Sequence, residues 1–440
     1  MAPQQGDTPR GTLLRGQAGL ARVGGVAAVR NWAGNVTFGA RVLHRPTSVE
    51  ALQQLVAASP RIHALGTGHS FNRIADTDGD LVSVADLDIP IVIDADARTV
   101  RVGGGTRFGE LAVALHEQGW ALPNLGSLPH ISVAGAFATG THGSGDANRC
   151  LAAGAVGVEY VRADGELVTV TAGDPDFGGS VLALGALGIV TALTLRIVPD
   201  FELRQDVWLD APLHSVLADL DAIMAAGYSV SLFTDWSRRD VVDSIWVKSL
   251  PHTVVADGRA WGAHPATVAQ HPIKSEDAGA ATEQLGRPGP WHARLPHFRA
   301  EFTPSAGQEQ QTEYLVRRSD GAAALATVSE LPLQAALQVS EIRTVAADEL
   351  WLSPFRGRDT LCLHFTWVDD DALVQPAVKA VEAALAPFDP RPHWGKVFGA
   401  HFSRAQFARH YPRLDDFRAL AAANDPDRCF GNAYLREFIY

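Results

Sequence analysis

The segment Gly66-Thr67-Gly68-His69-Ser70-Phe71-Asn72 comes directly after a predicted strand, 61–65. Two more glycine-rich segments lie in the same half of the chain: Gly103-Gly104-Gly105, again after a predicted strand, and the nearly uncharged stretch Pro123–Gly145. Glycine lets backbone N–H groups approach a ligand closely, and such groups bind a diphosphate without a cationic side chain. One cluster of this kind would more often be only a tight turn, but three favour a large anionic cofactor.

His69 lies among the small residues of the first segment. A lone histidine is more often a packed side chain than a functional one. Its position on a glycine-flanked turn is what favours a function, because a side chain there can meet a ligand that the backbone holds.

The spacing of apolar residues predicts mixed α and β structure around these segments. Thr47-Ser48-Val49-Glu50 has the spacing of a capping box that begins at Thr47, and Leu52 and Val56 follow on the apolar face of the helix. Apolar residues at i, i+3, i+4 and i+7 from Phe108 predict a second helix, which Gly119 ends. Strands are predicted at 41–43, 61–65, 81–84, 91–93, 99–102, 160–162, 167–170 and 189–197.

A second domain is predicted after Pro199 and Asp200. Apolar faces predict helices over 213–220 and 374–385, and β-rich runs predict strands at 229–234, 244–247 and 361–367. The Gly- and Pro-rich piece 253–291 is predicted to be a loop excursion. The pattern indicates an antiparallel sheet with helices.

Composition and charge exclude several classes of protein. The 440 residues are 46% hydrophobic and 20% charged, as in a soluble globular protein of two or three domains. A net charge of −12 makes nucleic acids and anionic membranes poor partners. No stretch approaches the roughly 20 apolar residues that span a bilayer. Cys150, Cys362 and Cys429 form no CxxC pair, which fits thiols in a reducing cytosol.

The chemistry-bearing residues of the second half lie in β-like contexts. The Rossmann, P-loop, HExxH and GxSxG fingerprints are absent from the sequence, and histidine spacing predicts no metal site. Glu341-Ile342-Arg343, His364-Phe365-Thr366 and His393-Trp394-Gly395-Lys396 stand out instead. In an alternating strand Glu341 and Arg343 share one face. They form either a structural ion pair or a polyol site, because hydroxyls need donors and acceptors at fixed places; spacing does not decide between the two.

Taken together, several segments resemble the alditol oxidases, which belong to the vanillyl-alcohol-oxidase superfamily of FAD enzymes. The segments are Asn31–Asn35, Gly66–Asn72, Leu125–Gly145, Glu341–Thr344, Thr366 and His393–Lys396. The resemblance implies an α+β fold: a two-part FAD-binding domain plus a substrate-binding cap domain, whose antiparallel sheet is flanked by helices. We therefore predict a flexible N-terminal extension (1–30), an FAD-binding domain (31–200), a cap domain (201–395) and a C-terminal segment (396–440) that returns to the FAD-binding domain.

The resemblance also implies the site residues. FAD would lie extended in the first half and be joined covalently to His69 through the flavin's 8α carbon. The residues matched to the cofactor are Gly66, Thr67, Gly68, His69, Ser70, Phe71, Ser127, Ser132, Gly135, Thr139, Gly140, Thr141, His142, Val190, Arg343, Thr366 and His393. The residues matched to the substrate are Ser127, Glu341, Arg343, Thr366 and Lys396, with Glu341, Arg343 and Lys396 as the catalytic group. Gly126 departs from the alanine of the family and, beside the flavin, would alter oxygen access or pocket shape.

The implied reaction is oxidation of the terminal primary alcohol of alditols, such as xylitol and sorbitol, to the aldose, with O2 reduced to H2O2. Arg343 and Lys396 would stabilise the charge left when the hydroxyl loses its proton, and Lys396 suits proton handling because buried lysines shift their pKa. Two other interpretations stay open: an aldonolactone or aldose oxidoreductase of the same superfamily that uses O2 or another acceptor, and a non-catalytic flavin- or sugar-binding protein. We expect a monomeric cytoplasmic protein.

Overall fold

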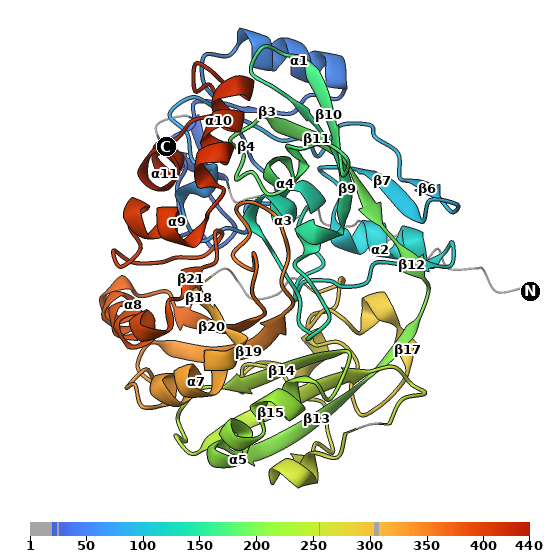
Figure 1. The fold of residues 1–440 in the computed structure, drawn as a ribbon, viewed down its shortest axis with the longest axis vertical. Helices are drawn as coiled ribbons and strands as arrows, with labels where there is room; N and C mark the ends of the chain where they lie inside the picture. Colours follow the sequence, from blue (N-terminus) through green and yellow to red (C-terminus); the bar gives the residue numbers. More distant parts are fainter. Residues whose placement is uncertain (1–19, 24–25, 255, 303–307) are drawn as a thin grey trace, which may run out of the picture.

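The structure is a computed structural model that describes residues 20–23, 26–254, 256–302 and 308–440. In Figure 1 the first half of the chain lies above the second, and the C-terminal helices lie beside the first half. Most of the predicted extension 1–30 lies outside the described residues. Within it, β1 (Leu20–Val23) pairs antiparallel with β2 (Val26–Val29).

The first half builds a parallel sheet and a larger antiparallel sheet. The parallel sheet has the order β3 (Leu43–His44), β5 (Asp80–Val82), β4 (Ile62–Ala64). The antiparallel sheet has the order β10 (Leu167–Thr171), β9 (Ala155–Val161), β11 (Ile189–Arg196), β7 (Thr99–Gly103), β6 (Val92–Asp94). The other elements are α1 (Val49–Ala58), η1 (Arg73–Ala75), α2 (Phe108–His116), β8 (Trp120–Ala121), α3 (Val133–Thr139), η2 (Leu151–Gly154), α4 (Phe177–Ser180) and β12 (Val198–Pro199).

The two helices predicted in this half are present, with one correction. The N-cap of α1 is Ser48, whose Oγ accepts the backbone N–H of Ala51, so the capping residue predicted at Thr47 is wrong by one position. Leu52 and Val56 are fully buried, as the apolar spacing predicts. Helix α2 ends at His116, and Gly119 follows it with a φ of 78°, a conformation that glycine adopts without strain.

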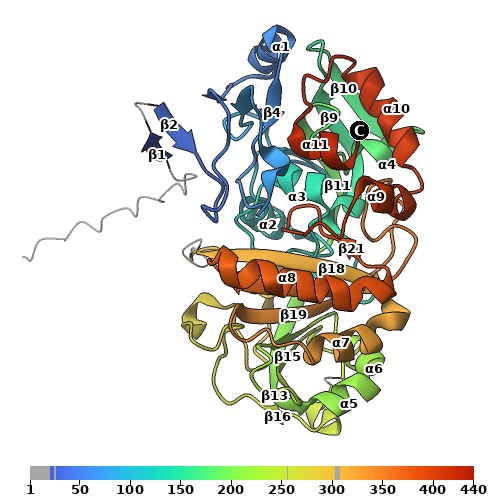
Figure 2. The same ribbon diagram turned by 90° about the vertical axis from the view of Figure 1, so that its left-hand side faces the viewer.

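The second half is dominated by one antiparallel sheet. Its order is β16 (His264–Pro265), β13 (Glu202–Pro212), β15 (Val241–Ser249), β14 (Ser229–Thr234), β19 (Leu337–Val345), β20 (Thr360–Val368), β18 (Glu309–Arg317), β21 (Arg391–Pro392), and β17 (Gly289–Pro290) pairs with β13. The helices of this half are α5 (Leu213–Ala218), α6 (Leu220–Met224), α7 (Gly321–Ser329) and α8 (Asp371–Leu385). Figure 2 shows α7 and α8 against the sheet. The helix predicted over 213–220 is interrupted at Asp219.

The piece predicted as a loop excursion, 253–291, contains only short elements in its described part. They are η3 (Gly258–Trp261), η4 (Ala278–Ala280) and the strands β16 and β17, and η5 (Trp291–Ala293) begins at its last residue. Two more 3₁₀ turns are η6 (Arg318–Asp320) and η7 (Ala386–Phe388). No helix among the described residues is long and apolar enough to cross a membrane.

The end of the chain packs against the first half. It forms α9 (Arg404–His410), α10 (Leu414–Asn424) and α11 (Ala433–Phe438). The side-chain amide of Asn432 donates to the carbonyl oxygens of Ile74 and Asp76, at 2.8 and 2.9 Å. The hydroxyl of Tyr160 in β9 donates to Asn424 at 3.0 Å. The C-terminal helices are therefore tied to η1 and to β9 of the first half.

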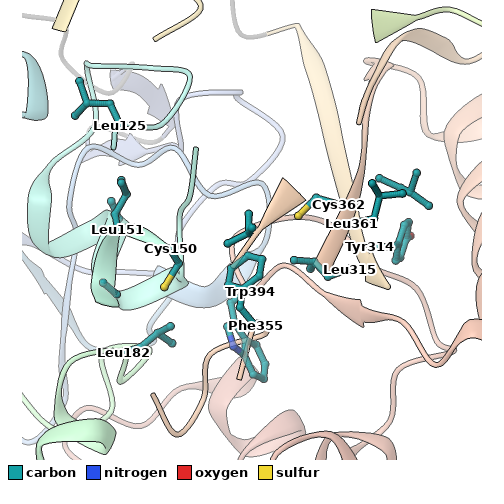
Figure 3. Close-up of a cluster of buried hydrophobic side chains, with 14 of the residues drawn as sticks. Leu125, Cys150, Leu151, Leu182, Tyr314, Leu315, Phe355, Leu361, Cys362 and Trp394 are labelled. Carbon is teal, nitrogen blue, oxygen red and sulfur yellow. The ribbon is translucent and has the colours of Figure 1, made fainter. Parts of the chain in front are cut away.

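A shared hydrophobic cluster joins the two halves. Figure 3 shows Leu125, Leu151 and Leu182 of the first half together with Phe355 and Trp394 of the second. Each of these five side chains is at most 7% exposed. Burial of apolar side chains stabilises by roughly 1.5–3 kcal/mol each, so the cluster holds the two halves in a defined relative position. Residues from both halves can therefore form one site.

Candidate active site

A cavity of about 1490 Å³ lies between the two halves. One wall is formed by the turn after β4, the segment 127–142 and parts of β11. The other is formed by polar side chains of β18, β19 and β20 and by the segment 393–396. The glycine-rich segments and the charged groups of the second half therefore face the same space.

The first wall is shaped by glycines that leave room for close approach. A Cβ atom on Gly66 would lie 2.7 Å from Oγ of Ser132, and one on Gly135 would lie 2.9 Å from the same oxygen. A Cβ on Gly104 would lie 2.8 Å from the carbonyl oxygen of Val190. Oγ of Ser132 is buried and has no hydrogen-bond partner in the protein. Since buried polar atoms are normally paired, this oxygen suits a bound polar ligand.

His69 is held on the turn by three contacts. Its Nδ1 lies 3.0 Å from the hydroxyl of Thr67, and its ring stacks on Trp32 with centroids 5.2 Å apart. Gly68, at a φ of 73°, turns its carbonyl oxygen to the backbone N–H of Trp32 at 2.7 Å. Burial, with the nearby charges of His130 and Arg107, lowers the pKa of His69 to about 4. The imidazole is therefore neutral near pH 7 and has an unprotonated nitrogen.

The second wall carries a charged group, which we call the polar cage: Glu313, Glu341, Arg343 and Lys396. Glu341 and Arg343 share one face of β19 and are both 5% exposed, as the alternation predicts. Arg343 donates to Glu313 at 2.8 Å and to Oγ of Ser127 at 3.3 Å, and its Nε lies 3.5 Å from Glu341. The ion pair expected as one alternative is therefore present, but it lines the cavity and is not enclosed in the core.

Lys396 completes the polar cage from the loop that follows β21. Its Nζ donates to the side-chain oxygen of Gln311 and lies 5.1 Å from the centre of the Phe71 ring. Burial lowers the pKa of Lys396 to about 8; Glu313 opposes this shift and Arg343 adds to it. The side-chain amide of Asn72 donates to the carbonyl oxygens of Trp394 and Lys396 at 2.8 and 2.7 Å. The turn that bears His69 and the loop that bears Lys396 are thus fastened together.

Nearly all the residues predicted for the site line this cavity. They are Gly66, Thr67, Gly68, His69, Ser70, Phe71, Ser127, Ser132, Gly135, Thr139, Thr141, His142, Val190, Glu341, Arg343, Thr366, His393 and Lys396. Gly140 is not among the lining residues. It ends α3 in the left-handed conformation, at a φ of 73°, with its N–H directed to the carbonyl oxygens of Ala136 and Phe137. Gly126 also lies behind the wall, next to the lining residue Ser127.

Many residues that face the cavity were not among the predicted site residues, and four of them belong to the polar lining: Gln311, Glu313, His297 and His364. Gln311 and Glu313 alternate on β18, so the same-face argument used for β19 would have found them. His364 lies on β20 two positions before Thr366, and its Nε2–H donates to the side-chain oxygen of Gln311 at 3.1 Å. Burial lowers the pKa of His364 to about 3. No local pattern marks His297, which lies in the loop after η5.

His142, Glu313 and His393 each place one potential metal-ligand atom within 4.8 Å of the others. The sequence predicts no metal. Glu313 already accepts a hydrogen bond from Arg343 at 2.8 Å, and its Oε1 lies 3.1 Å from Nε2 of His142. A divalent cation bound there would lie close to the guanidinium charge, which disfavours it. We therefore interpret the three residues as part of the polar lining.

Comparisons with known proteins agree with this geometry. The chain is 52% identical to an alditol oxidase of Streptomyces sp. over 94% of this chain and 99% of that protein. It is 29% identical to L-gulono-1,4-lactone dehydrogenase of Mycobacterium tuberculosis over 93% of this chain and 98% of that protein. Residues 40–171 match the FAD binding domain family, and residues 306–438 match the D-arabinono-1,4-lactone oxidase family.

Solved structures support the same fold. Cholesterol oxidase from B. sterolicum superposes with a TM-score of 0.75 at 14% identity, over 94% of this chain and 96% of that one. Fold, site and the alditol oxidase relative together define an oxidoreductase with an FAD-binding domain and a second domain. The chain belongs to the alditol oxidase family. The fold class and the family predicted from the sequence are confirmed.

Proposed function

We propose that this protein oxidises the terminal primary alcohol of alditols, such as xylitol and sorbitol, to the aldose while O2 becomes H2O2. The observation that carries the proposal is the polar cage facing the glycine-lined wall across one cavity. The 52% identity to an alditol oxidase gives the substrate class its support. Bound FAD supplies the acceptor for the hydride that leaves C1 of the alcohol.

The polar cage provides the remaining chemistry. Lys396 accepts the hydroxyl proton, because a pKa near 8 lets its amine be neutral close to the working pH. Arg343 keeps its charge and stabilises the negative charge that develops on the alcohol oxygen. Glu341 accepts hydrogen bonds from other hydroxyls of the polyol, and Ser127 and Thr366 offer further hydroxyls from the cavity lining.

The first wall suits FAD in its shape and in its unpaired groups. Ser132 would donate to the cofactor, and Gly66, Gly104 and Gly135 leave the space in which it lies. His69 would be joined covalently to the flavin, since a neutral imidazole is a nucleophile and a protonated one is not. Arg343, Thr366 and His393 would approach the flavin from the second wall.

We also propose the domain limits 31–200 and 201–395, with 396–440 returning to the first domain, and a monomer that works in the cytoplasm. The sheet of the first half ends at Arg196 and that of the second begins at Glu202. Cys150, Cys362 and Cys429 are all buried free thiols. Burial raises the pKa of each of these thiols, so none is activated as a thiolate.

The direct test uses the purified holoprotein with xylitol, sorbitol and L-gulono-1,4-lactone. We expect both alditols to bleach the yellow flavin under nitrogen and to release H2O2 in air, and the lactone to do neither. The lactone arm matters because part of the chain matches the D-arabinono-1,4-lactone oxidase family. Faster bleaching by the lactone than by either alditol would replace the proposal with a lactone oxidoreductase. Bleaching by alditols without H2O2 would remove O2 as the acceptor.

Gly126 offers a separate test of oxygen access. An added Cβ would lie 3.4 Å from Cγ2 of Thr141 and 3.6 Å from the carbonyl oxygen of His142, which are ordinary contact distances. We expect Gly126→Ala to fold and to be reduced by xylitol under nitrogen at the wild-type rate, and to react more slowly with O2, because the methyl group narrows the space behind Ser127. Stopped-flow reoxidation measures the second rate. An unchanged rate would mean that O2 does not pass this position.

A further inference from the structure

A chain of hydrogen bonds leads from the protein interior to Glu341 through His297, which itself lines the cavity. Lys248 of β15, which is 1% exposed, donates to the carbonyl oxygens of Leu295 and Pro296, and its Nζ lies 3.4 Å from Nδ1 of His297. Nε2 of His297 lies 2.7 Å from Oε1 of Glu341. The chain thus runs from a buried amine through an imidazole to a carboxylate of the polar cage.

Donor and acceptor rules fix the tautomer of His297. An ionised carboxylate only accepts, so Nε2 of His297 must carry a proton to bond with Glu341. Burial, with the charge of Lys248, lowers the pKa of His297 to about 4, so the ring is neutral near pH 7 and Nδ1 is bare. Nδ1 then accepts from Lys248, whose other hydrogen bonds go to two carbonyl oxygens.

The ring and the backbone of His297 are both held in place. Phe233 and Trp246 meet the imidazole edge to face, with centroids 5.3 and 5.7 Å away. The backbone N–H of His297 donates to the carbonyl oxygen of Ser127 at 3.2 Å. One residue therefore contacts both the strand that bears Glu341 and the segment that bears Ser127.

We propose that His297 is a positioning residue for alditol oxidation, whose Nε2–H fixes Oε1 of Glu341 so that Oε2 is presented to a polyol hydroxyl. The contacts of Glu341 with His297 and Arg343 both use Oε1, and Glu341 lines the cavity. Lys248 holds the imidazole in the tautomer that can donate. This inference rests on the proposed function, because it assigns Glu341 to substrate hydroxyls.

The charge of Glu341 depends on the groups around it. Burial alone would raise its pKa, but Arg343 and then His297 outweigh burial and hold the pKa well below its ordinary value. The titratable and charged groups that face Glu341 from the packed elements are Arg343 on β19, His364 on β20, Glu313 on β18, Lys248 on β15, Lys396 in the loop after β21 and His297. Removing the His297 donor therefore moves the pKa of Glu341 upwards.

The test compares His297→Phe with His297→Gln. Phenylalanine keeps the contacts with Phe233 and Trp246 but cannot donate, whereas the glutamine amide can. We expect His297→Phe to lower kcat/KM for xylitol about 10- to 100-fold, as for loss of a hydrogen bond to a charged group. Glu341 is ionised only above its pKa, which is raised in this variant. As the pH is lowered, we therefore expect the variant to lose activity at a higher pH than the wild type does. His297→Gln should retain most of the activity and the wild-type pH profile.

His410→Phe is the matched control. His410 is also buried, at 5% exposed, and its Nε2 lies 2.8 Å from the carboxylate of Asp389. Neither residue is among those that line the cavity. The His410→Phe variant should have the wild-type pH profile of kcat/KM. If His297→Phe has the wild-type pH profile and kcat/KM, or if His297→Gln loses as much as His297→Phe, the positioning role is wrong.

A second measurement is independent of turnover. Nitrogen NMR of histidine-labelled wild-type holoprotein, with the His297 signal assigned by its absence in His297→Gln, should show a neutral Nε2–H imidazole from about pH 6 to 9. A doubly protonated ring or an Nδ1–H tautomer would overturn the inference whatever the substrate is. If this tautomer is present but no alditol is oxidised, the proposed function is wrong. The hydrogen bonds among Lys248, His297 and Glu341 would then be confirmed, but the positioning role in alditol oxidation would be overturned.

Discussion

Replacing Lys396 with alanine is expected to lower kcat for xylitol about 10³-fold while the protein still folds and keeps its flavin. Lys396 carries the amine of the polar cage. Its Nζ lies 5.1 Å from the ring of Phe71, on the turn that bears His69. The backbone contacts of Asn72 with Trp394 and Lys396 do not involve the amine, so the loop keeps its position in the variant. The loss should therefore appear in kcat and not in flavin content.

The pH profile separates two roles for this amine. If neutral Lys396 accepts the hydroxyl proton, kcat/KM rises as pH rises through about 8, the pKa that burial gives this group. If its positive charge is what matters, kcat/KM falls over the same range. We expect the first behaviour.

Lys396→Arg is the matched variant, because arginine keeps the charge and cannot deprotonate near pH 8. It should be nearly as inactive as Lys396→Ala. An active Lys396→Arg variant, or a wild-type profile that falls through pH 8, would contradict the role of Lys396 as proton acceptor.

The elements that depend on local sequence were predictable. The apolar faces at Phe108–Leu115 and Val374–Leu385 are buried in α2 and α8 because their 3.6-residue period needs no information from elsewhere in the chain. Glu341 and Arg343 share a face because the period of a strand is two. The helix boundaries at the N-cap of α1 and at Asp219 differ from the predicted ones, because the ends of elements are set by individual hydrogen bonds.

The parts of the site that depend on distant contacts were not predictable. His297 meets Glu341 across 44 positions, and Lys248 meets His297 across 49. No spacing rule connects a loop histidine to a strand lysine, so only the fold reveals them. Gly140 shows the converse: the family resemblance implied a cofactor contact for it, but its φ of 73° at the end of α3 gives it a structural reason of its own.

His69→Ala is expected to abolish the covalent attachment of FAD completely. The neutral imidazole, held between Thr67 and Trp32 on the glycine-lined wall, is the nucleophile that we assign to the bond. After acid precipitation, the wild-type pellet should stay yellow, whereas all the flavin of His69→Ala should pass into the supernatant. Intact mass should show one FAD fewer on the variant.

His130→Ala is the control for this experiment. His130 is close enough for its charge to lower the pKa of His69, but it is not among the residues that line the cavity. It should keep the covalent flavin, and because one positive neighbour of His69 is lost, the pKa of His69 should rise slightly without reaching 7. A yellow precipitate from His69→Ala would assign the bond to another residue of the cavity. A bare polypeptide mass for the wild-type protein from riboflavin-supplied cells would mean that FAD is held only by the glycine-lined wall.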